Sequence, residues 1–217
     1  MKAIVLLSGG IDSAAALYWA KGQGWKTYAL TFDYEREQSP ELRGAKAIAR
    51  SAGVRHFVEK VEFYKRLRGS PSSSRSKIVD EERGISRAYV PARNIVFLGM
   101  AAAYAETLGA DTIVTGHNLG DAERFPDATG PFFDVFDELL RLGLKSSQSG
   151  RQVKVLAPFN GMTKEEVLRE ALKLGVPLKA TWSCYNNGRR PCGVCYGCRA
   201  RSRAFRAVGV EDPLTVV

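Results

Sequence analysis

The stretch AIVLLSGGIDS, residues 3–13, joins an apolar run to a loop of two glycines, two serines and an aspartate. Residues 3–7 are apolar without a break, which predicts a strand buried on both faces of a sheet. Residues 13–21 have the pattern of a helix that ends near the glycines at 22–24. The loop is therefore expected at the carboxyl end of a strand, where open α/β sheets bind their ligands.

The same alternation of strands and helices continues along the chain. Further strands are expected at residues 27–32, 55–61, 112–115 and 153–157, and further helices at residues 41–52, 94–108, 132–142 and 163–174. Continuous apolar strands separated by helices predict an α/β fold, with a doubly wound, mostly parallel sheet and helices on both of its faces. We expect residues 1–180 to form this domain and residues 181–217 to form a small C-terminal lobe packed on the same domain.

Two stretches interrupt the alternation. Residues 66–87 are rich in Gly, Ser, Pro and charged residues, which predicts a surface excursion, either an active-site lid or a plain insertion. Residues 118–131 contain glycines, prolines and carboxylates, and we expect them to form a loop.

The composition limits the class of protein. The chain has 217 residues and a formal net charge of +9, which favours an anionic partner such as a nucleotide, a phosphate or RNA. A basic surface that only aids solubility is the alternative. No run approaches the roughly 18 uninterrupted apolar residues of a membrane span, and the N-terminus lacks the pattern of a signal peptide. The expected location is the cytoplasm.

The loop after the first strand has the composition of a phosphate site. Gly9 and Gly10 permit a tight turn that brings backbone N–H groups close to a ligand, and the following helix points its positive end at the same place. Ser8 and Ser13 add hydroxyl donors, whereas Asp12 would repel a phosphate and is better suited to Mg²⁺. The alternative is an ordinary glycine-rich turn, because the loop lacks the G-x-x-x-x-G-K-[S/T] pattern of nucleotide kinases.

All four cysteines of the chain lie in one short segment, at Cys184, Cys192, Cys195 and Cys198. A disulfide framework would spread its cysteines over distant loops, so the clustering indicates a metal site. Four thiolates suit tetrahedral Zn²⁺ and leave no open position, which makes the expected zinc structural. An iron–sulfur cluster is the alternative.

Several separated stretches together resemble a known family. The S-G-G-x-D-S loop resembles that of the PP-loop ATP pyrophosphatases, and the longer pattern resembles the 7-cyano-7-deazaguanine synthases, the QueC family. The matching segments are YVPARN at residues 89–94, FPD at 125–127, TK at 163–164, TWSCY at 181–185, and the cysteines from 192 to 198 with Arg199 and Arg201. The chain departs from the family pattern at residues 35–38, at His117 and at Ala128.

The resemblance implies a fold like that of the adenine nucleotide alpha hydrolases and an ATP-dependent enzyme. Such an enzyme converts 7-carboxy-7-deazaguanine and ammonia to 7-cyano-7-deazaguanine through adenylated intermediates, for queuosine and archaeosine modification of tRNA. It implies small-molecule substrates, no obligatory nucleic acid, no membrane, and a homodimer. Another PP-loop enzyme acting on tRNA, such as a tRNA thiolase, is the alternative, although all four thiols are expected to serve one metal.

The resemblance also implies roles for individual residues. ATP and its Mg²⁺ are expected at the loop, on Ser8, Gly9, Gly10, Ile11, Asp12 and Ser13. Catalytic roles are expected for Lys164, Asp121 and Arg93, and substrate binding for Arg93, Asn94 and Asp127.

Each of these roles has a plainer alternative. Lys164 could be a solvated lysine at a helix end, Asn94 an N-cap, and Asp121 and Asp127 carboxylates of a loop and a turn. His117 is expected to be a loop or backbone-bonded histidine rather than a proton-transfer group. Arg199, Arg201 and Arg203 are expected either on a solvated helix face or, for the first two, facing phosphate.

Overall fold

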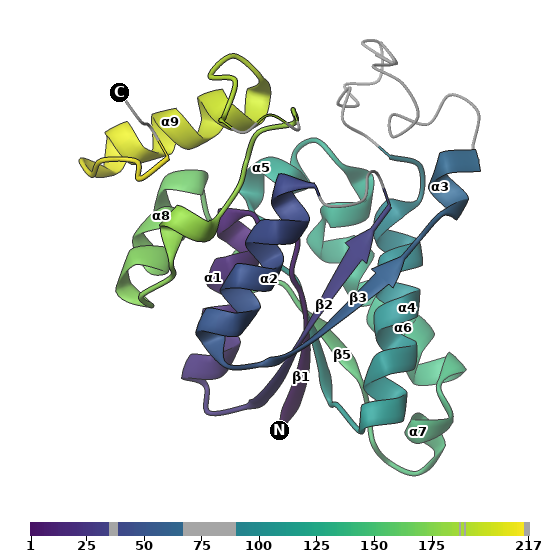
Figure 1. Ribbon diagram of the computed structural model, residues 1–217. Coiled ribbons are helices and arrows are strands. Elements are labelled where there is room, and N and C mark those ends of the chain that lie inside the picture. The colour runs from purple at the N-terminus through teal and green to yellow at the C-terminus, as the bar shows by residue number, and fades with distance from the viewer. Residues whose placement is uncertain (35–38, 67–89, 187, 189, 215–217) are drawn as a thin grey trace.

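The computed structural model describes residues 1–34, 39–66, 90–186, 188 and 190–214. In this part of the chain, five strands form one sheet in the order β3-β2-β1-β4-β5, and every neighbouring pair is parallel (Figure 1). The strands are β1 (Lys2–Leu6), β2 (Lys26–Asp33), β3 (Arg55–Lys60), β4 (Thr112–Val114) and β5 (Lys154–Leu156). The expected parallel α/β sheet is confirmed, with strand ends close to the predicted ones.

Helices connect the strands as predicted. The longer ones are α1 (Ile11–Gly22), α2 (Pro40–Ala52), α4 (Arg93–Leu108), α6 (Gly130–Gly143), α8 (Lys164–Lys173) and α9 (Tyr196–Val208). The shorter ones are α3 (Phe63–Arg66), α5 (Leu119–Ala122), α7 (Lys145–Gln148), η2 (Pro126–Ala128) and η3 (Leu178–Ala180). The capping box expected at the start of α8 is present, with Thr163 and Glu166 bonded to each other's backbone N–H groups.

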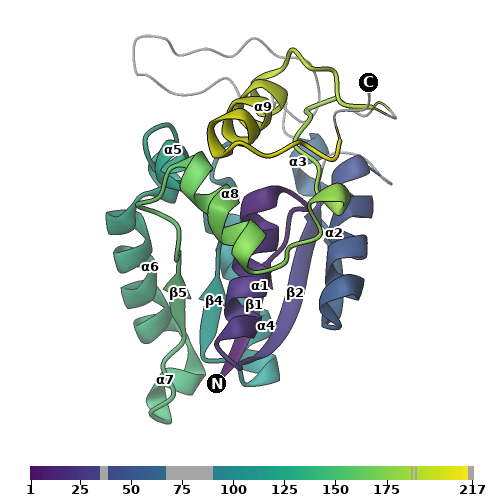
Figure 2. The ribbon, with the colours of Figure 1, turned by 90° about the vertical axis from the view of Figure 1, so that its left-hand side faces the viewer.

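The sheet separates two hydrophobic cores. Alternate residues of β1 point to opposite faces, so Ala3 and Val5 join one core and Ile4 joins the other. The first core is completed by α1, α2 and α8, and the second by α4 and α6, on the two sides of the sheet (Figures 1 and 2). This is the doubly wound arrangement, in which continuous apolar strands are covered on both faces.

The strand order sets where a ligand can bind. Connections run outward in one direction from β1 to β3 and in the other from β4 to β5. A crevice therefore opens between the carboxyl ends of β1 and β4, at the topological switch point. The loop at residues 8–10 follows β1 directly and lies at this point.

One expectation about the connecting segments is wrong, and the expectations for two others are not tested. Residues 118–131 do not form a plain loop, because α5, η2 and the start of α6 lie within them. Residues 35–38 and 67–89 lie outside the described part of the chain, so the expectations for residues 35–38 and for the excursion at residues 66–87 stay predictions. No described helix is both long and apolar enough to cross a membrane.

The C-terminal helix α9 packs on the layer of α1 and α8. Ala204 and Phe205 of α9 belong to the same hydrophobic core as residues of α1, α2 and α8. Figure 2 shows α9 above α8, at the carboxyl end of the strands. The expected division of the chain at residue 180 stays a prediction, and this shared core supports the packing expected between its two parts.

Candidate active site

The loop after β1 has a backbone that only glycine can supply at its centre. Gly9 has a φ of +94°, and a Cβ on this residue would lie 2.2 Å from the carbonyl oxygen of Glu41. The loop therefore presses directly on the first turn of α2. From the other side, the backbone N–H of Trp182 donates to the Gly9 carbonyl over 2.8 Å. These two contacts fix the turn between α2 and the segment that leads to the cysteines.

The start of α1 is open to an anion. Gly10 is the N-cap residue, and in the described chain no side chain caps this helix end. Ser13 Oγ donates to the Gly10 carbonyl and also lies 3.0 Å from Ser8 Oγ, so the two hydroxyls stand together at the helix start. Unpaired N–H groups, a positive helix end and paired hydroxyls are the elements of a phosphate site.

A partly buried ion pair lies beside this helix start. The Lys164 ammonium pairs with Asp12 Oδ2, and the two side chains are 23% and 19% exposed. The second oxygen, Asp12 Oδ1, is buried and has no hydrogen-bond partner in the described residues. A half-satisfied carboxylate next to a phosphate site fits a Mg²⁺ ion that accompanies a triphosphate, because Mg²⁺ prefers oxygen ligands.

Two cavities meet at the loop. The outer cavity, of about 500 Å³, lies between α1, α5, α8 and α9, and the inner cavity, of about 290 Å³, lies between β1, β2 and α4. The residues that line both are Ser8, Asp12, Glu41 and Asp121. The loop after β1 thus lies between two cavities, each able to receive a small molecule.

The inner cavity has an apolar side and a polar side. Its apolar side comes from Leu6, Leu30, Phe32 and Phe97. On the polar side, Arg93 Nη1 donates to the Tyr34 hydroxyl over 3.4 Å. Burial lowers the pKa of Arg93, but Tyr34 and the carboxylates of Asp127 and Asp121 raise it above its usual value overall, so the guanidinium stays charged.

His117 is held by side chains in this cavity. Its Nε2 accepts from Asn94 Nδ2 over 3.1 Å, and its Nδ1 donates to Thr115 Oγ1 over 3.0 Å. Burial, with a smaller effect of Arg93, lowers the pKa of His117 to about 4. The ring is therefore neutral near pH 7. His117 lies in a loop, one of the two settings that we expected, and its bonds are to side chains rather than to the backbone.

Asn94 and Asp127 form a local brace. The Asn94 backbone N–H donates to Asp127 Oδ2 over 3.1 Å, and Asn94 Nδ2 donates to the Asp127 carbonyl over 2.8 Å. Ala92, with a φ of 53°, is the N-cap position of α4, so Asn94 is not the cap. Asn94 lines the inner cavity, whereas Asp127 is buried behind it and lines neither cavity.

The outer cavity is lined by charged side chains of both signs and by aromatic rings. Lys164 and Asp121, both expected at the site, line it together with the loop. Side chains that the sequence did not single out, Arg124 and Tyr196, also contribute to its wall, with the Arg124 guanidinium 4.1 Å from the centre of the Tyr196 ring. Glu41, which lines both cavities, was missed as well. Its place at the first turn of α2, directly behind Gly9, arises only in the folded chain, so the sequence carries no signal for it.

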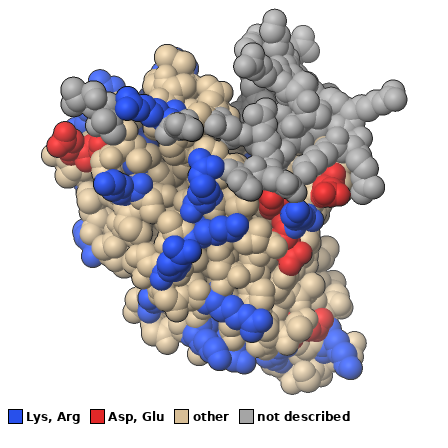
Figure 3. Space-filling view, viewed as in Figure 1, with Lys and Arg blue, Asp and Glu red and all other residues tan. Residues whose placement is uncertain are grey.

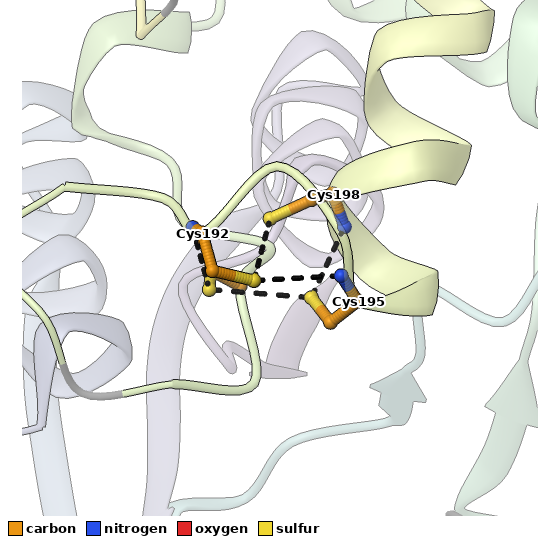
Figure 4. A group of neighbouring side chains, drawn as sticks. Cys192, Cys195 and Cys198 are labelled. Carbon is orange, nitrogen blue, oxygen red and sulfur yellow. Dashed lines mark hydrogen bonds between the residues drawn. The ribbon is translucent and has the colours of Figure 1, made fainter.

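The four cysteines converge as expected. Their Sγ atoms all lie within 4.8 Å of one another, with Cys192 and Cys198 3.9 Å apart and Cys195 and Cys184 4.0 Å apart (Figure 4). Four sulfurs 2.3 Å from a tetrahedral metal would be separated by about 3.8 Å, so the arrangement fits a Cys₄ metal ion. Backbone N–H groups of Asn186, Cys192, Cys195 and Cys198 donate to the sulfurs, as they do in sites that hold thiolates.

One expectation about the basic residues of α9 is wrong. Arg201 is 3% exposed and forms an ion pair with Asp212, so it lies on neither a solvated face nor a phosphate site. Its Nη1 donates to Thr181 Oγ1 over 2.7 Å, which ties α9 to the segment that precedes Trp182. Arg199 and Arg203 are exposed, and Arg203 lines the outer cavity. On the face shown in Figure 3, several groups of Lys and Arg side chains lie scattered over a mostly uncharged surface.

Comparisons with known proteins agree with this geometry. A 4-thiouridine synthetase, solved in complex with RNA and ATP, has a TM-score of 0.54 at 19% identity, over 96% of this chain and 50% of that one, which shows likeness of fold alone. The 7-cyano-7-deazaguanine synthase of Trichormus variabilis is 40% identical over 99% of this chain and 97% of that protein. The synthase of the same name from Methanosphaerula palustris is 39% identical over 99% of this chain and 98% of that protein.

The family description "Queuosine biosynthesis protein QueC" matches residues 2–209, which include the loop after β1, the two cavities and all four cysteines. With this match and the identity across almost the whole chain, the protein belongs to the QueC family.

Proposed function

We propose that the protein converts 7-carboxy-7-deazaguanine, ammonia and ATP to 7-cyano-7-deazaguanine, a precursor of the modified tRNA bases queuosine and archaeosine. The observation that carries the proposal is the position of the phosphate loop between two cavities. Adenylation needs a nucleotide and an acid to meet at one phosphorus atom, and a shared wall at Ser8 and Asp12 provides that meeting point.

The chemistry repeats one activation. A carboxylate oxygen attacks the α-phosphorus of ATP and pyrophosphate leaves. Ammonia then attacks the acyl carbon and AMP leaves with that oxygen, which gives the primary amide and a released proton. A second ATP adenylates the amide oxygen, with release of pyrophosphate and one N–H proton, and loss of AMP and the remaining N–H proton leaves the nitrile. Both rounds convert an oxygen that is a poor leaving group into AMP.

The described residues support defined roles in this sequence. The N–H groups at the start of α1, with Ser8 and Ser13, hold the pyrophosphate. Lys164 neutralises charge that develops between the α- and β-phosphates, and Asp12 and Asp121 supply carboxylate oxygens for the Mg²⁺ bound with ATP. Arg93 and Asn94 contact one of the two reactants, ATP or the acid, from the inner cavity. Asp127 acts behind them, through its two hydrogen bonds with Asn94.

The thiolase alternative is less well supported by the cysteines. Sulfur transfer by such enzymes needs a reactive cysteine or a cluster, and all four cysteines of the chain lie in one compact group. We propose a structural Zn²⁺ there, held by the four thiolates. Metal analysis of purified protein should give one zinc and no iron per chain. Iron with acid-labile sulfide would instead support a cluster and reopen the thiolase assignment.

A homodimer is also proposed, as the resemblance implies. On α6, Val135, Leu139 and Leu142 are 71%, 57% and 69% exposed, and their spacing places them on one face of the helix. An exposed apolar face of this kind supports association with a second copy. Light scattering should give the dimer mass, and Leu139→Glu should shift it to the monomer mass.

The function itself is tested by incubation with ATP, Mg²⁺, ammonium and 7-carboxy-7-deazaguanine. Mass spectrometry should detect AMP, pyrophosphate, the amide and the nitrile. Omission of ammonium should stop both the amide and the nitrile. Absence of both products over a range of pH and temperature, with folded and metal-loaded protein, would reject the proposal.

A further inference from the structure

The wall of the outer cavity contains a preorganised guanidinium. Arg124 Nε donates to the Gly120 carbonyl over 2.7 Å, and the guanidinium carbon lies 4.1 Å from the centre of the Tyr196 ring. The hydrogen bond fixes one edge of the group, and stacking on the ring fixes its plane. In the described residues, Arg124 has no carboxylate partner and its Nη atoms have no acceptor, so a donor fork is left for a ligand.

We infer that the outer cavity binds the deazaguanine acid and that Arg124 receives its carboxylate edge. The inference rests on the proposed function. In this acid the ring carbonyl and the carboxylate lie on one edge of a flat bicycle, where guanine presents O6 and N7. A guanidinium reads such an edge with two parallel hydrogen bonds. One carboxylate oxygen is then held and the other is free to attack the α-phosphorus.

The rest of the outer cavity combines stacking faces with charges of both signs, because the carboxylates of Asp12, Glu41, Asp121, Glu123 and Glu165 line it beside Arg124, Lys164 and Arg203. Aromatic side chains of Trp182, Tyr185 and Tyr196 line it, and they provide faces on which a flat bicycle can stack. Lys164 lies on the same wall as the phosphate loop, so the carboxylate edge would face the ammonium and the α-phosphate together. Tyr185 also lies on the wall of this cavity, and its hydroxyl can donate a hydrogen bond to the ligand.

The inner cavity is the poorer place for an acid. It is smaller, and its single arginine, Arg93, already donates to the Tyr34 hydroxyl and lies near the charge of Asp127. Its apolar side, from β1, β2 and α4, suits the adenine ring, which carries no charge. Adenosine on one side of the loop and the acid on the other places the α-phosphorus between them.

Steady-state kinetics with Arg124→Ala and Arg124→Lys test the assignment. Arg124→Ala should raise KM for the acid roughly 10- to 100-fold, the range expected for a lost bidentate pair, and leave KM for ATP within about 2-fold. Arg124→Lys keeps the charge and loses the fork, so it should recover only part of the loss. The matched control is Arg141→Ala, which removes an exposed arginine of α6 and should change neither constant.

The stacked ring offers a second pair of variants. Tyr196→Phe keeps the face under Arg124 and should behave like the wild type, whereas Tyr196→Leu should raise KM for the acid. Calorimetric titration with the acid alone should show the same order of affinities without turnover.

An unchanged KM for the acid in both Arg124 variants would overturn the inference, as would a rise confined to KM for ATP. If the wild-type protein makes the nitrile and the Arg124 variants give either of these results, only the assignment of Arg124 and the outer cavity is rejected. A wild-type protein that makes neither amide nor nitrile would reject the proposed function and the inference with it.

Discussion

Lys164 and Asp12 form an ion pair although 152 residues separate them in the sequence. Lys164 is the first residue of α8, and Asp12 lies in the first turn of α1. The pair places an ammonium and a carboxylate next to the loop after β1. We expect a bound triphosphate to draw the ammonium toward its phosphates and to leave both Asp12 oxygens to the Mg²⁺ ion.

Replacement of Lys164 should affect the chemical step. We expect Lys164→Ala to lower kcat roughly 100- to 1,000-fold, the range for loss of one group that stabilises developing charge. Formation of AMP from ATP and the acid, measured under saturating substrate, checks this. Lys173→Ala is the control, because it removes a lysine from the same helix whose ion pair with Glu170 is exposed. An activity loss in both variants would indicate a defect of α8 rather than of catalysis.

Gly9 is expected to be irreplaceable for a steric reason. Gly9 and Gly24 both have positive φ, but a Cβ on Gly9 would meet the Glu41 carbonyl, whereas a Cβ on Gly24 would meet no atom within 4 Å. Both alanine variants carry a backbone cost of about 1–2 kcal/mol. Only Gly9→Ala should also weaken ATP binding, by at least about 10-fold, because α2 must move away from the loop. Calorimetric titration with ATP and Mg²⁺ separates the two, and equal weakening in both would contradict the steric argument.

The fold and the loop were predictable because local patterns encode them. Unbroken apolar runs mark the parallel strands, and the Thr163 and Glu166 capping box marks the start of α8. The cysteine spacing likewise predicted the cluster. Each of these signals lies within a few residues of the feature that it predicts.

Contacts between distant segments could not be predicted in this way. No local pattern pairs Arg124 with Tyr196, because α5 and α9 meet only in the folded chain. The burial of Arg201 was readable in principle, since Arg199, Arg203 and Arg206 share one face of α9 and Arg201 falls on the other. The arginines at every second position from 199 to 203 suggested a helix that is basic on all sides. The period of 3.6 residues per turn instead places Arg201 on the face opposite to the others.

His117 should stay neutral over the working pH range. Its pKa is lowered to about 4, mainly by burial, whereas an unfolded histidine titrates near 6.5. The unfolded state therefore binds a proton first as the pH falls. The stabilisation is complete above about pH 6.5 and is lost as the pH falls toward 4, by up to about 3 kcal/mol.

NMR can test this directly, because the chain has only two histidines. The His117 ring signals should show no titration between about pH 5.5 and 8. His117→Gln should remove this part of the pH dependence of the free energy of unfolding. A titration of His117 near pH 6.5 in the folded protein would contradict the neutral ring.

Metal removal should weaken nucleotide binding from a distance. Trp182 lies two residues before Cys184, and its backbone N–H holds the Gly9 carbonyl. Without the metal, or in Cys198→Ser, the segment that follows residue 182 is no longer held by the cysteine cluster. The Gly9 carbonyl then loses the N–H of Trp182, one of the two contacts that fix the loop. We expect weaker ATP binding and a changed tryptophan fluorescence, both restored by Zn²⁺ in the unmodified protein. If metal-free protein binds ATP with unchanged affinity, the cysteine cluster does not contribute to ATP binding at the loop.

Arg201 should matter for stability rather than for contact with substrate. Its side chain is buried and bonded to Asp212, to Thr181 and to the Leu178 carbonyl, so it joins α9 to the residues that precede Trp182. Removing one partner of a buried ion pair costs roughly 3–5 kcal/mol. Arg201→Ala should lower the free energy of unfolding by that amount in denaturant titrations, while Arg206→Ala, at an exposed position of the same helix, should change it by less than about 0.5 kcal/mol. Equal effects of the two substitutions would show that the bonds of Arg201 with Thr181 and Asp212 contribute little to the packing of α9 on the rest of the protein.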